Sequence, residues 1–199
     1  MQRKQHSLRF ILAVAAMACF SGAYAQRHAL KTNALYWAAG GSGNLTYEYK
    51  FADRWTANIS GGLNLWCRYG SRDRNRKIRH VLVQPEVRYW FCEAFSGHYV
   101  GAHAIYSHYN AGNVHMPFGI WKDLRHNRFQ GDLGAIGVLY GYNWPVSSHS
   151  SIEATVGIGV GITNYDKYGC NWCADRIGNE TKTFVMPTKL ALSYVYYFK

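Results

Sequence analysis

Apolar and polar residues alternate along most of this chain. In segment 81–91, "VLVQPEVRYWF", Val83 and Val87 fall on one side, whereas Glu86 and Arg88 fall on the other. A period of two residues predicts a β-strand. One face of this strand is apolar and the other carries an acid beside a base, so the surroundings of each face decide what kind of sheet the strand belongs to.

The same alternation predicts eight strands, at residues 30–38, 44–51, 55–66, 81–91, 98–109, 131–144, 151–164 and 183–198. The connections "ADR", "CEAFSG" and "PVSSHS" are tight, whereas three of the other four connections, at 67–79, 110–129 and 165–182, are long. Short turns at one end and long loops at the other are typical of an outer-membrane barrel. We therefore expect an all-β chain that forms an eight-stranded antiparallel up-and-down transmembrane β-barrel.

A membrane barrel fixes the facing of every strand. Lipid can solvate Val83 and Val87 but not Glu86 or Arg88, so the charged face must point inward. Eight strands enclose a space that side chains just fill, and a charge buried there is costly unless it is paired. We therefore expect a closed, polar, side-chain-filled interior. The predicted interior charges are Lys31, Lys50, Arg88 and Lys189 against Glu48, Glu86 and Glu153, of which Glu48, Glu86, Arg88, Glu153 and Lys189 form the expected structural network.

Residues 1–25 have the pattern of a cleavable signal peptide. Arg3, Lys4 and Arg9 accompany the apolar run "FILAVAAMACF", and "AYA" provides a small-residue cleavage site. A retained membrane helix is disfavoured because the run is shorter than the roughly 20 residues that a span needs. Lipidation of Cys19 is disfavoured because "AMA" is a poor lipobox and no polar tether follows. The expected organisation is a signal peptide at 1–25 and one barrel domain at 26–199.

The composition favours the membrane over a soluble barrel. With 48% hydrophobic residues, 16 Tyr and 7 Trp, the chain can supply two aromatic girdles at the membrane interfaces. A soluble, lipocalin-like periplasmic barrel is an alternative that predicts the reverse facing, with Val83, Val87, Val156 and Ile158 lining a cavity. All 11 acidic residues and all but three of the 22 basic ones follow residue 25, so the mature part carries a net charge of +8.

Several segments together resemble a known family. They are "LKTNALYW", "VQPEVRYWFCEAFSGHYVGAHAIYSHYN", "FQGDLGAIGVLYGYNW", "IEATVGIGVGITNYDKYGC" and "PTKLALSYVYYFK". The resemblance is to an uncharacterised family of small outer-membrane barrels in Gram-negative Bacteroidetes. It implies about eight strands, no assigned enzymatic activity and frequent encoding near surface fimbria components. It implies no catalytic or binding residues.

Four cysteines follow the predicted signal peptide. Cys170 and Cys173 form "CNWC" in a long loop, where an oxidising envelope favours a disulfide. A redox or metal role is the alternative. A structural zinc site requires four ligands and the chain has no second paired cysteine motif, so we expect no metal and no cofactor. Cys67 and Cys92 belong to opposite ends of neighbouring strands. A bond between them is disfavoured because bridged Cα atoms lie within about 7 Å.

The second long-side loop, at residues 67–79, is strongly basic. It carries a net charge of +5, because only Asp73 opposes its bases Arg68, Arg72, Arg74, Arg76, Lys77 and Arg79. Outside a Gram-negative cell the abundant anions are lipopolysaccharide phosphates, which guanidinium groups bind in a bidentate manner. Nucleic acid is an unsuitable partner in that compartment. The loop is therefore a candidate anion contact, and a merely solvated loop is the alternative.

We expect a structural or surface-interaction protein of the outer membrane, associated with fimbriae or in contact with lipopolysaccharide, and neither a transporter nor an enzyme. The alternative is an outer-membrane enzyme with a site at the outer rim. Its candidate residues are His103, His108, His115, His126, Asp123 and Asp132. Neither a nucleophile elbow nor a fixed spacing supports that alternative, and surface histidines without a catalytic role are the favoured interpretation.

We predict that the mature protein begins at Gln26, because Ala23 and Ala25 fit the small-residue cleavage pocket. Intact-mass measurement of the purified protein should give the mass of residues 26–199. A chain that retains Met1, or that carries a lipid on Cys19, would contradict this assignment.

Overall fold

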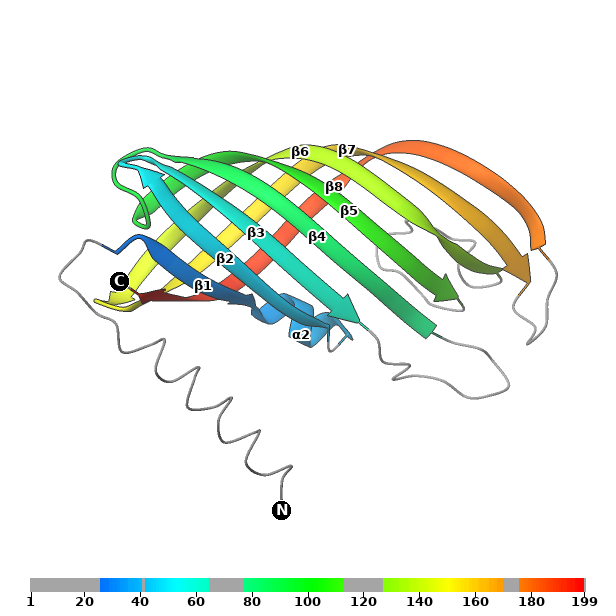
Figure 1. Cartoon of the computed structure of the whole chain (residues 1–199), viewed down its shortest axis with the longest axis horizontal. Coiled ribbons are helices and arrows are strands. Elements are labelled where there is room, and N and C mark those ends of the chain that lie inside the picture. Colours follow the sequence, from blue (N-terminus) through cyan, green and yellow to red (C-terminus); the bar gives the residue numbers. More distant parts are fainter. Residues whose placement is uncertain (1–25, 41, 65–76, 113–126, 170–175, 199) are drawn as a thin grey trace, which may run out of the picture.

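The computed structural model describes residues 26–40, 42–64, 77–112, 127–169 and 176–198. They form one closed antiparallel barrel in which each strand pairs with its neighbours in the chain and the last strand pairs with the first (Figure 1). The strands are β1 (His28–Asn33), β2 (Gly43–Ala52), β3 (Trp55–Asn64), β4 (Lys77–Trp90), β5 (Gly97–Gly112), β6 (Asn127–Ser147), β7 (Ser150–Gly169) and β8 (Arg176–Phe198). The predicted eight-stranded up-and-down architecture is confirmed.

The first strand is shorter than predicted. The expected strand at 30–38 ends at Asn33, and residues Ala34–Gly40 form a helix, α2. The Asn33 side-chain oxygen accepts a hydrogen bond from the backbone N–H of Leu35 at 3.0 Å, which is the contact of a helix N-cap. The same oxygen accepts from the N–H of Leu192 in β8 at 3.2 Å. One side chain therefore ends the strand and begins the helix.

Strands β6, β7 and β8 are longer than predicted and extend beyond the ends of β1, β2 and β3 (Figure 1). Pairing between β7 and β8 continues past Asn164 and Thr181 to Tyr168 and Arg176. The sequence prediction ended these strands where the apolar alternation ends. Backbone pairing continues past that point, because the strand ends that lie beyond the apolar outer band do not need an apolar outer face.

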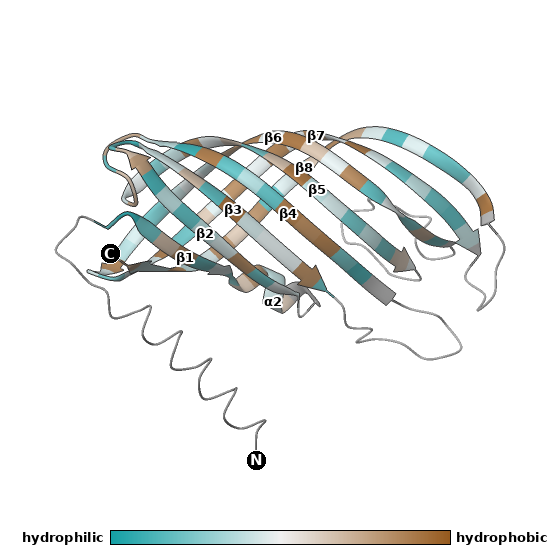
Figure 2. Ribbon diagram, in the orientation of Figure 1, coloured by the Kyte–Doolittle hydropathy of each residue, from teal (hydrophilic) through white to brown (hydrophobic). Residues whose placement is uncertain are grey.

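The polarity of the barrel is inverted relative to a soluble protein. Apolar side chains point outward and are largely exposed, for example Ile136 (70%) and Leu190 (63%). The charged side chains of Glu86 and Arg88 point inward and are buried. Figure 2 shows the resulting alternation of hydrophobic and hydrophilic residues along the strands. This facing is the one expected for a membrane barrel and the reverse of the lipocalin-like alternative.

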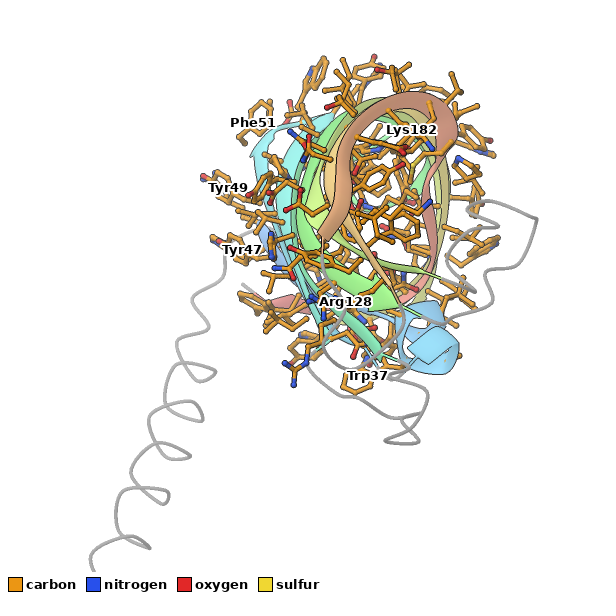
Figure 3. All side chains as sticks on the ribbon, turned by 90° about the vertical axis from the view of Figure 1, so that its right-hand side faces the viewer. Trp37, Tyr47, Tyr49, Phe51, Arg128 and Lys182 are labelled. Carbon is orange, nitrogen blue, oxygen red and sulfur yellow. The ribbon has the colours of Figure 1, made fainter. Side chains whose placement is uncertain are left out.

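Aromatic side chains form an outer belt near the end with the short turns. In Figure 3, Tyr47, Tyr49 and Phe51 project outward from β2. Neighbouring strands continue the belt with the exposed or half-buried residues Trp55, Tyr89, Phe91, Tyr140, Tyr142, Trp144, Tyr194 and Tyr196. Toward the opposite end, the exposed aromatic residues in the described part of the chain are Trp37 and Tyr106. The described residues therefore supply one dense girdle rather than two equal ones.

The short-turn end of the interior is closed by aromatic rings. The tilted rings of Trp90 and Tyr99 pack with centroids 4.5 Å apart, and Phe95 packs against Tyr197 at 5.1 Å. Phe95 reaches this position from the β4–β5 connection in a left-handed backbone conformation (φ 72°) that a bulky residue rarely adopts. All four rings are almost fully buried. The β4–β5 connection therefore folds inward and closes this end.

The closure needs a glycine at position 141. Gly141 lies opposite Tyr99 in the β5–β6 pairing, and a Cβ atom there would come within 2.3 Å of the Tyr99 ring and 2.8 Å of the Ala154 carbonyl oxygen. We predict that Gly141→Ala lowers the free energy of unfolding by about 1–3 kcal/mol through overpacking. Equilibrium urea unfolding of the purified protein in detergent measures this change.

Gly134→Ala is the matched control on the same strand, because its Cβ would have no heavy atom within 4 Å. Its stability should remain within about 0.5 kcal/mol of the parent. Equal effects of the two substitutions would show that Tyr99 does not depend on the space above Gly141.

Candidate functional site

Six charged side chains from five strands meet inside the barrel. Arg88 of β4 is at the centre, and its Nη1 lies 2.8 Å from Glu153 Oε2 on β7 and 3.4 Å from Glu48 Oε2 on β2. Its Nε pairs with Glu86, which also accepts from Lys189 of β8. Lys31 of β1 pairs with Glu48 and lies 2.5 Å from Glu153. We call these residues the charge network: Lys31, Glu48, Glu86, Arg88, Glu153 and Lys189.

The charge network is electrically balanced, because three bases face three acids. Five of the six side chains are at most 2% exposed, and that of Lys189 is 12% exposed. Removing an isolated ion from water costs many kcal/mol, so burial on this scale needs complete pairing. The structure thus brings together all five residues of the predicted network and adds Lys31. Lys50, also predicted to be interior, is half-buried and has no ion pair among the described residues.

Neutral polar groups satisfy the remaining oxygen atoms of the acids. Thr56 donates to Glu48 Oε1 at 2.5 Å, and Asn58 donates to Glu86 Oε1 at 3.2 Å. Both donors lie on the inner face of β3, between β2 and β4. The Arg88 guanidinium also lies over the ring of Tyr99, 4.5 Å from its centroid. Arg88 therefore joins the charge network to the aromatic closure at the short-turn end.

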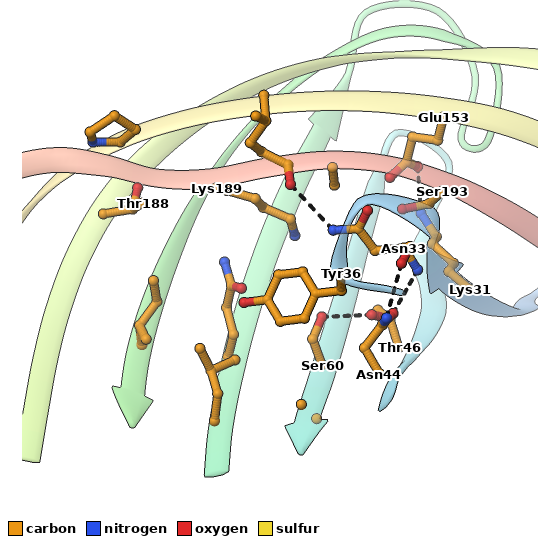
Figure 4. A pocket seen from close by; sticks show the side chains of 18 of the residues that line it. Lys31, Asn33, Tyr36, Asn44, Thr46, Ser60, Glu153, Thr188, Lys189 and Ser193 are labelled. Atoms are coloured by element: carbon orange, nitrogen blue, oxygen red, sulfur yellow. Dashed lines mark hydrogen bonds and ion pairs between the residues drawn. The ribbon is translucent and has the colours of Figure 1, made fainter. Parts of the chain in front are cut away.

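Beyond the charge network the interior is not filled, because a cavity of about 310 Å³ remains (Figure 4). Lys31, Glu153 and Lys189 border it on the side of the charge network, and Tyr36 of α2 points into it. The apolar part of its lining includes Leu82, Ile105, Leu133 and Met186. Sequence reasoning missed this cavity. Pro187, which interrupts β8, was the available signal, because proline in a strand marks an edge or a bulge.

The predicted anion contact lies mostly outside the described residues. This applies to Arg68, Arg72, Arg74 and Arg76 and to the side chain of Lys77. Arg79 lies on β4 and is exposed, at the end with the long connections. Residues 1–25, Cys67, Cys170 and Cys173 are also outside the described part, and Cys92 is exposed in the β4–β5 connection. The signal peptide, the disulfide and the anion contact therefore stay predictions.

Of the residues of the enzyme alternative that the structure describes, only His108 and Asp132 lie close together. His108 Nδ1 lies 2.9 Å from Asp132 on the outer surface, where Tyr106 also donates to Asp132 at 2.9 Å. His103 instead points into the barrel, and neither of its ring nitrogens has a hydrogen-bond partner in the described part of the chain. His115, Asp123 and His126 lie outside the described residues. Among the described residues, no group of three or more His, Cys, Asp or Glu side chains is arranged to hold a metal ion.

A family model described as "Protein of unknown function (DUF3575)" matches residues 10–198. The chain belongs to this family. A comparison with curated proteins found no match. The solved structure of the translocator domain of the autotransporter NalP from Neisseria meningitidis is similar, with 13% sequence identity and a TM-score of 0.43. The match covers 92% of this chain and 65% of that one, so the chain spans about two thirds of the length of that structure.

None of the helices in the described residues is long and apolar enough to cross a membrane.

We predict that Glu153→Gln lowers the free energy of unfolding by about 3–5 kcal/mol, because it leaves the buried Lys31 and Arg88 with an unbalanced positive charge. Chemical unfolding in detergent, followed by tryptophan fluorescence, measures the change. Glu180→Gln is the matched control, since its ion pair with Lys182 at 3.2 Å is about half exposed. The control should be affected far less. Similar losses in both variants would contradict a special role for the interior pairing.

Proposed function

We propose that this chain is an integral outer-membrane β-barrel protein with a structural or surface-interaction role. The observation that carries the proposal is the inverted polarity, with apolar side chains such as Ile136 and Leu190 exposed and a charge network buried. An exposed apolar surface that surrounds a whole barrel needs a lipid environment, since soluble monomers rarely expose apolar patches above a few hundred Å². Each strand pairs with two neighbours, including β8 with β1, so most backbone groups are satisfied within the sheet, as the hydrocarbon region requires.

The interior supports a role other than transport. The rings of Trp90, Phe95, Tyr99 and Tyr197 close the short-turn end, and the charge network crosses the barrel directly beside them. An open pore would need a continuous wet passage. A solute would have to break buried ion pairs and displace these rings to pass through.

The surface role is proposed for the end with the long connections. Strands β6, β7 and β8 extend there as a sheet beyond the barrel, with exposed polar residues such as Asn179, Glu180 and Lys182. The basic loop at 67–79 belongs to the same end, since it joins β3 to β4. Its charge suits the phosphates of lipopolysaccharide or an acidic surface partner. A fimbria component is the protein partner that the family resemblance suggests.

The membrane assignment is tested by fractionation and electrophoresis. The protein should be recovered with outer membranes, and the unheated protein should migrate differently from the heated protein on a denaturing gel, because the last strand pairs with the first and no terminal strand is left free to unravel. Recovery in the soluble periplasmic fraction would overturn the proposal.

We predict that replacing Arg68, Arg72, Arg74, Arg76, Lys77 and Arg79 with serine abolishes salt-sensitive binding to purified lipopolysaccharide, while the gel mobility shift of the folded barrel persists. Binding through exposed charges should weaken as salt rises, because screening is strong beyond about 10 Å at 0.1 M ionic strength. Arg27→Ser with Arg54→Ser is the control, since both residues are exposed near the short-turn end. If the six-residue variant binds as tightly as the parent, the loop is not the anion contact.

A further inference from the structure

Along most of its length, the edge of β8 that faces β1 has no strand partner among the described residues. Its pairing with β1 covers Ser193 to Phe198 and stops where β1 ends at Asn33. Two contacts of the Asn33 side chain extend it, a donation to the Leu190 carbonyl at 3.2 Å and an acceptance from the Leu192 N–H. From Lys189 toward Arg176, β8 pairs with β7 on one side, and the described residues provide no strand on the other. Helix α2 lies next to β8 just beyond the end of β1.

Part of this open edge lies at the middle of the apolar outer band. Pro187 and Leu190 pair with Ile158 and Val156 of β7, which occupy the centre of an outward-facing apolar row from Ile152 to Ile162. Within the hydrocarbon of a membrane, an unpaired strand edge is tolerated where it is buried in protein or lines a cavity. The backbone between residues 187 and 190 therefore requires a polar or protein-lined neighbour.

The cavity runs along this edge. In a strand with partners on both sides, alternate residues line the interior, yet every residue of β8 from Met186 to Ala191 lines this cavity. Leu190 is among them although its side chain points outward and is 63% exposed. A β-bulge contributes to this geometry, because Thr188 is an extra residue between the pairs Gly157–Lys189 and Ile158–Pro187. The cavity thus meets the wall of the barrel between α2 and β8.

The polar lining offers unused hydrogen-bonding groups. Gln84 is 6% exposed, and its Nε2 has no partner in the described part of the chain. The hydroxyl group of Thr188 is likewise buried without a described partner. Both residues line the cavity, and Tyr36 points into it near Lys189 (Figure 4). An amide N–H donor and two hydroxyl groups suit a ligand that carries several oxygen acceptors.

The charge network determines the charge of the ligand. Lys31, Glu153 and Lys189 border the cavity, but their charges are already balanced within the network. An ionised ligand would add an unpaired charge to a buried site, which is unfavourable. A neutral ligand adds none. The apolar part of the lining, with Leu82, Ile105 and Leu133, favours a molecule that also has a hydrocarbon portion.

We propose that this cavity binds an uncharged amphiphile with an oxygen-rich polar end, which enters sideways from the membrane between α2 and β8. The polar end lies against Gln84 and Thr188, and the acyl chain extends toward the lipid past Pro187 and Leu190. The cavity volume of about 310 Å³ lies at the lower end of the range for small-molecule sites, so it suits a headgroup rather than a whole lipid. This proposal rests on the proposed membrane location.

The test uses a photoactivatable monoacylglycerol, with its reactive group near the glycerol, added to the full mature chain in phosphatidylcholine vesicles. Peptide mapping by mass spectrometry should find saturable labelling on residues 186–191 or on α2, and unlabelled monoacylglycerol should compete. A photoactivatable fatty acid of the same length, ionised at pH 9, should not label these residues saturably.

Adjacent glycines on opposite faces of β3 provide a matched pair of variants. Gly62 faces the cavity, and a Cβ there would make ordinary contacts with Tyr36 at 3.5 Å and Leu82 at 3.7 Å, so Gly62→Leu adds its larger side chain to the cavity. Gly61→Leu is the control, because Gly61 borders the cavity through its backbone alone and a Cβ on its outward face meets no atom within 4 Å. Gly62→Leu should reduce the saturable labelling at least tenfold, and Gly61→Leu should leave it unchanged.

Gln84→Leu keeps the proposal testable if Gly62→Leu fails to fold. Losing one hydrogen bond should raise the half-saturating concentration of the probe roughly fivefold. Labelling confined to outward-facing residues such as Leu192, or unaffected by Gly62→Leu and Gln84→Leu, would overturn the proposal. So would equal labelling by the fatty acid. In each of these cases a normal gel mobility shift and outer-membrane recovery would leave the proposed membrane barrel intact.

Discussion

The central constraint on this structure is that its charges must balance inside a narrow barrel. Once the outer surface is apolar, the inner faces of the strands carry the polar residues, and an eight-stranded barrel leaves little room for water around them. Arg88 meets this constraint by contacting three acids, from its own strand and from β2 and β7. This cluster meets the aromatic closure where the Arg88 guanidinium lies over the Tyr99 ring, and it borders the cavity through Lys31, Glu153 and Lys189.

The period of two was sufficient to predict the strand count and the facing of each strand. It placed Glu86, Glu153 and Lys189 inside from the sequence alone, because a shift of one residue would have turned every apolar side chain of the strand inward. The ends of the strands could not be predicted in the same way. Residues 34–38 continue an acceptable alternation, yet the hydrogen bonds of Asn33 to two different elements start a helix there.

The cavity was beyond sequence reasoning for a different reason. Its existence depends on how far β1 extends beside β8 and on a one-residue bulge at Thr188, and neither feature changes the composition of the strand. The charge network was easier to predict from the sequence, because charged residues of a barrel with an apolar outer surface must face the interior. Alternation also placed its sixth member, Lys31, in the interior, but the pairing of Lys31 with Glu48 and Glu153 required the registers of β1 against β2 and β8.

The pairing of Lys31 with Glu153 has a consequence for how the barrel assembles. These residues belong to the first and seventh strands, and Lys31 reaches Glu153 across a sequence separation of 122 residues. Contacts this distant in sequence form late and slow folding, because a large loop must close before they contribute. Lys31 can pair with Glu48 as soon as β1 and β2 are joined, but its contact with Glu153 needs the ring to close. Ring closure therefore completes the neutralisation of the interior charges.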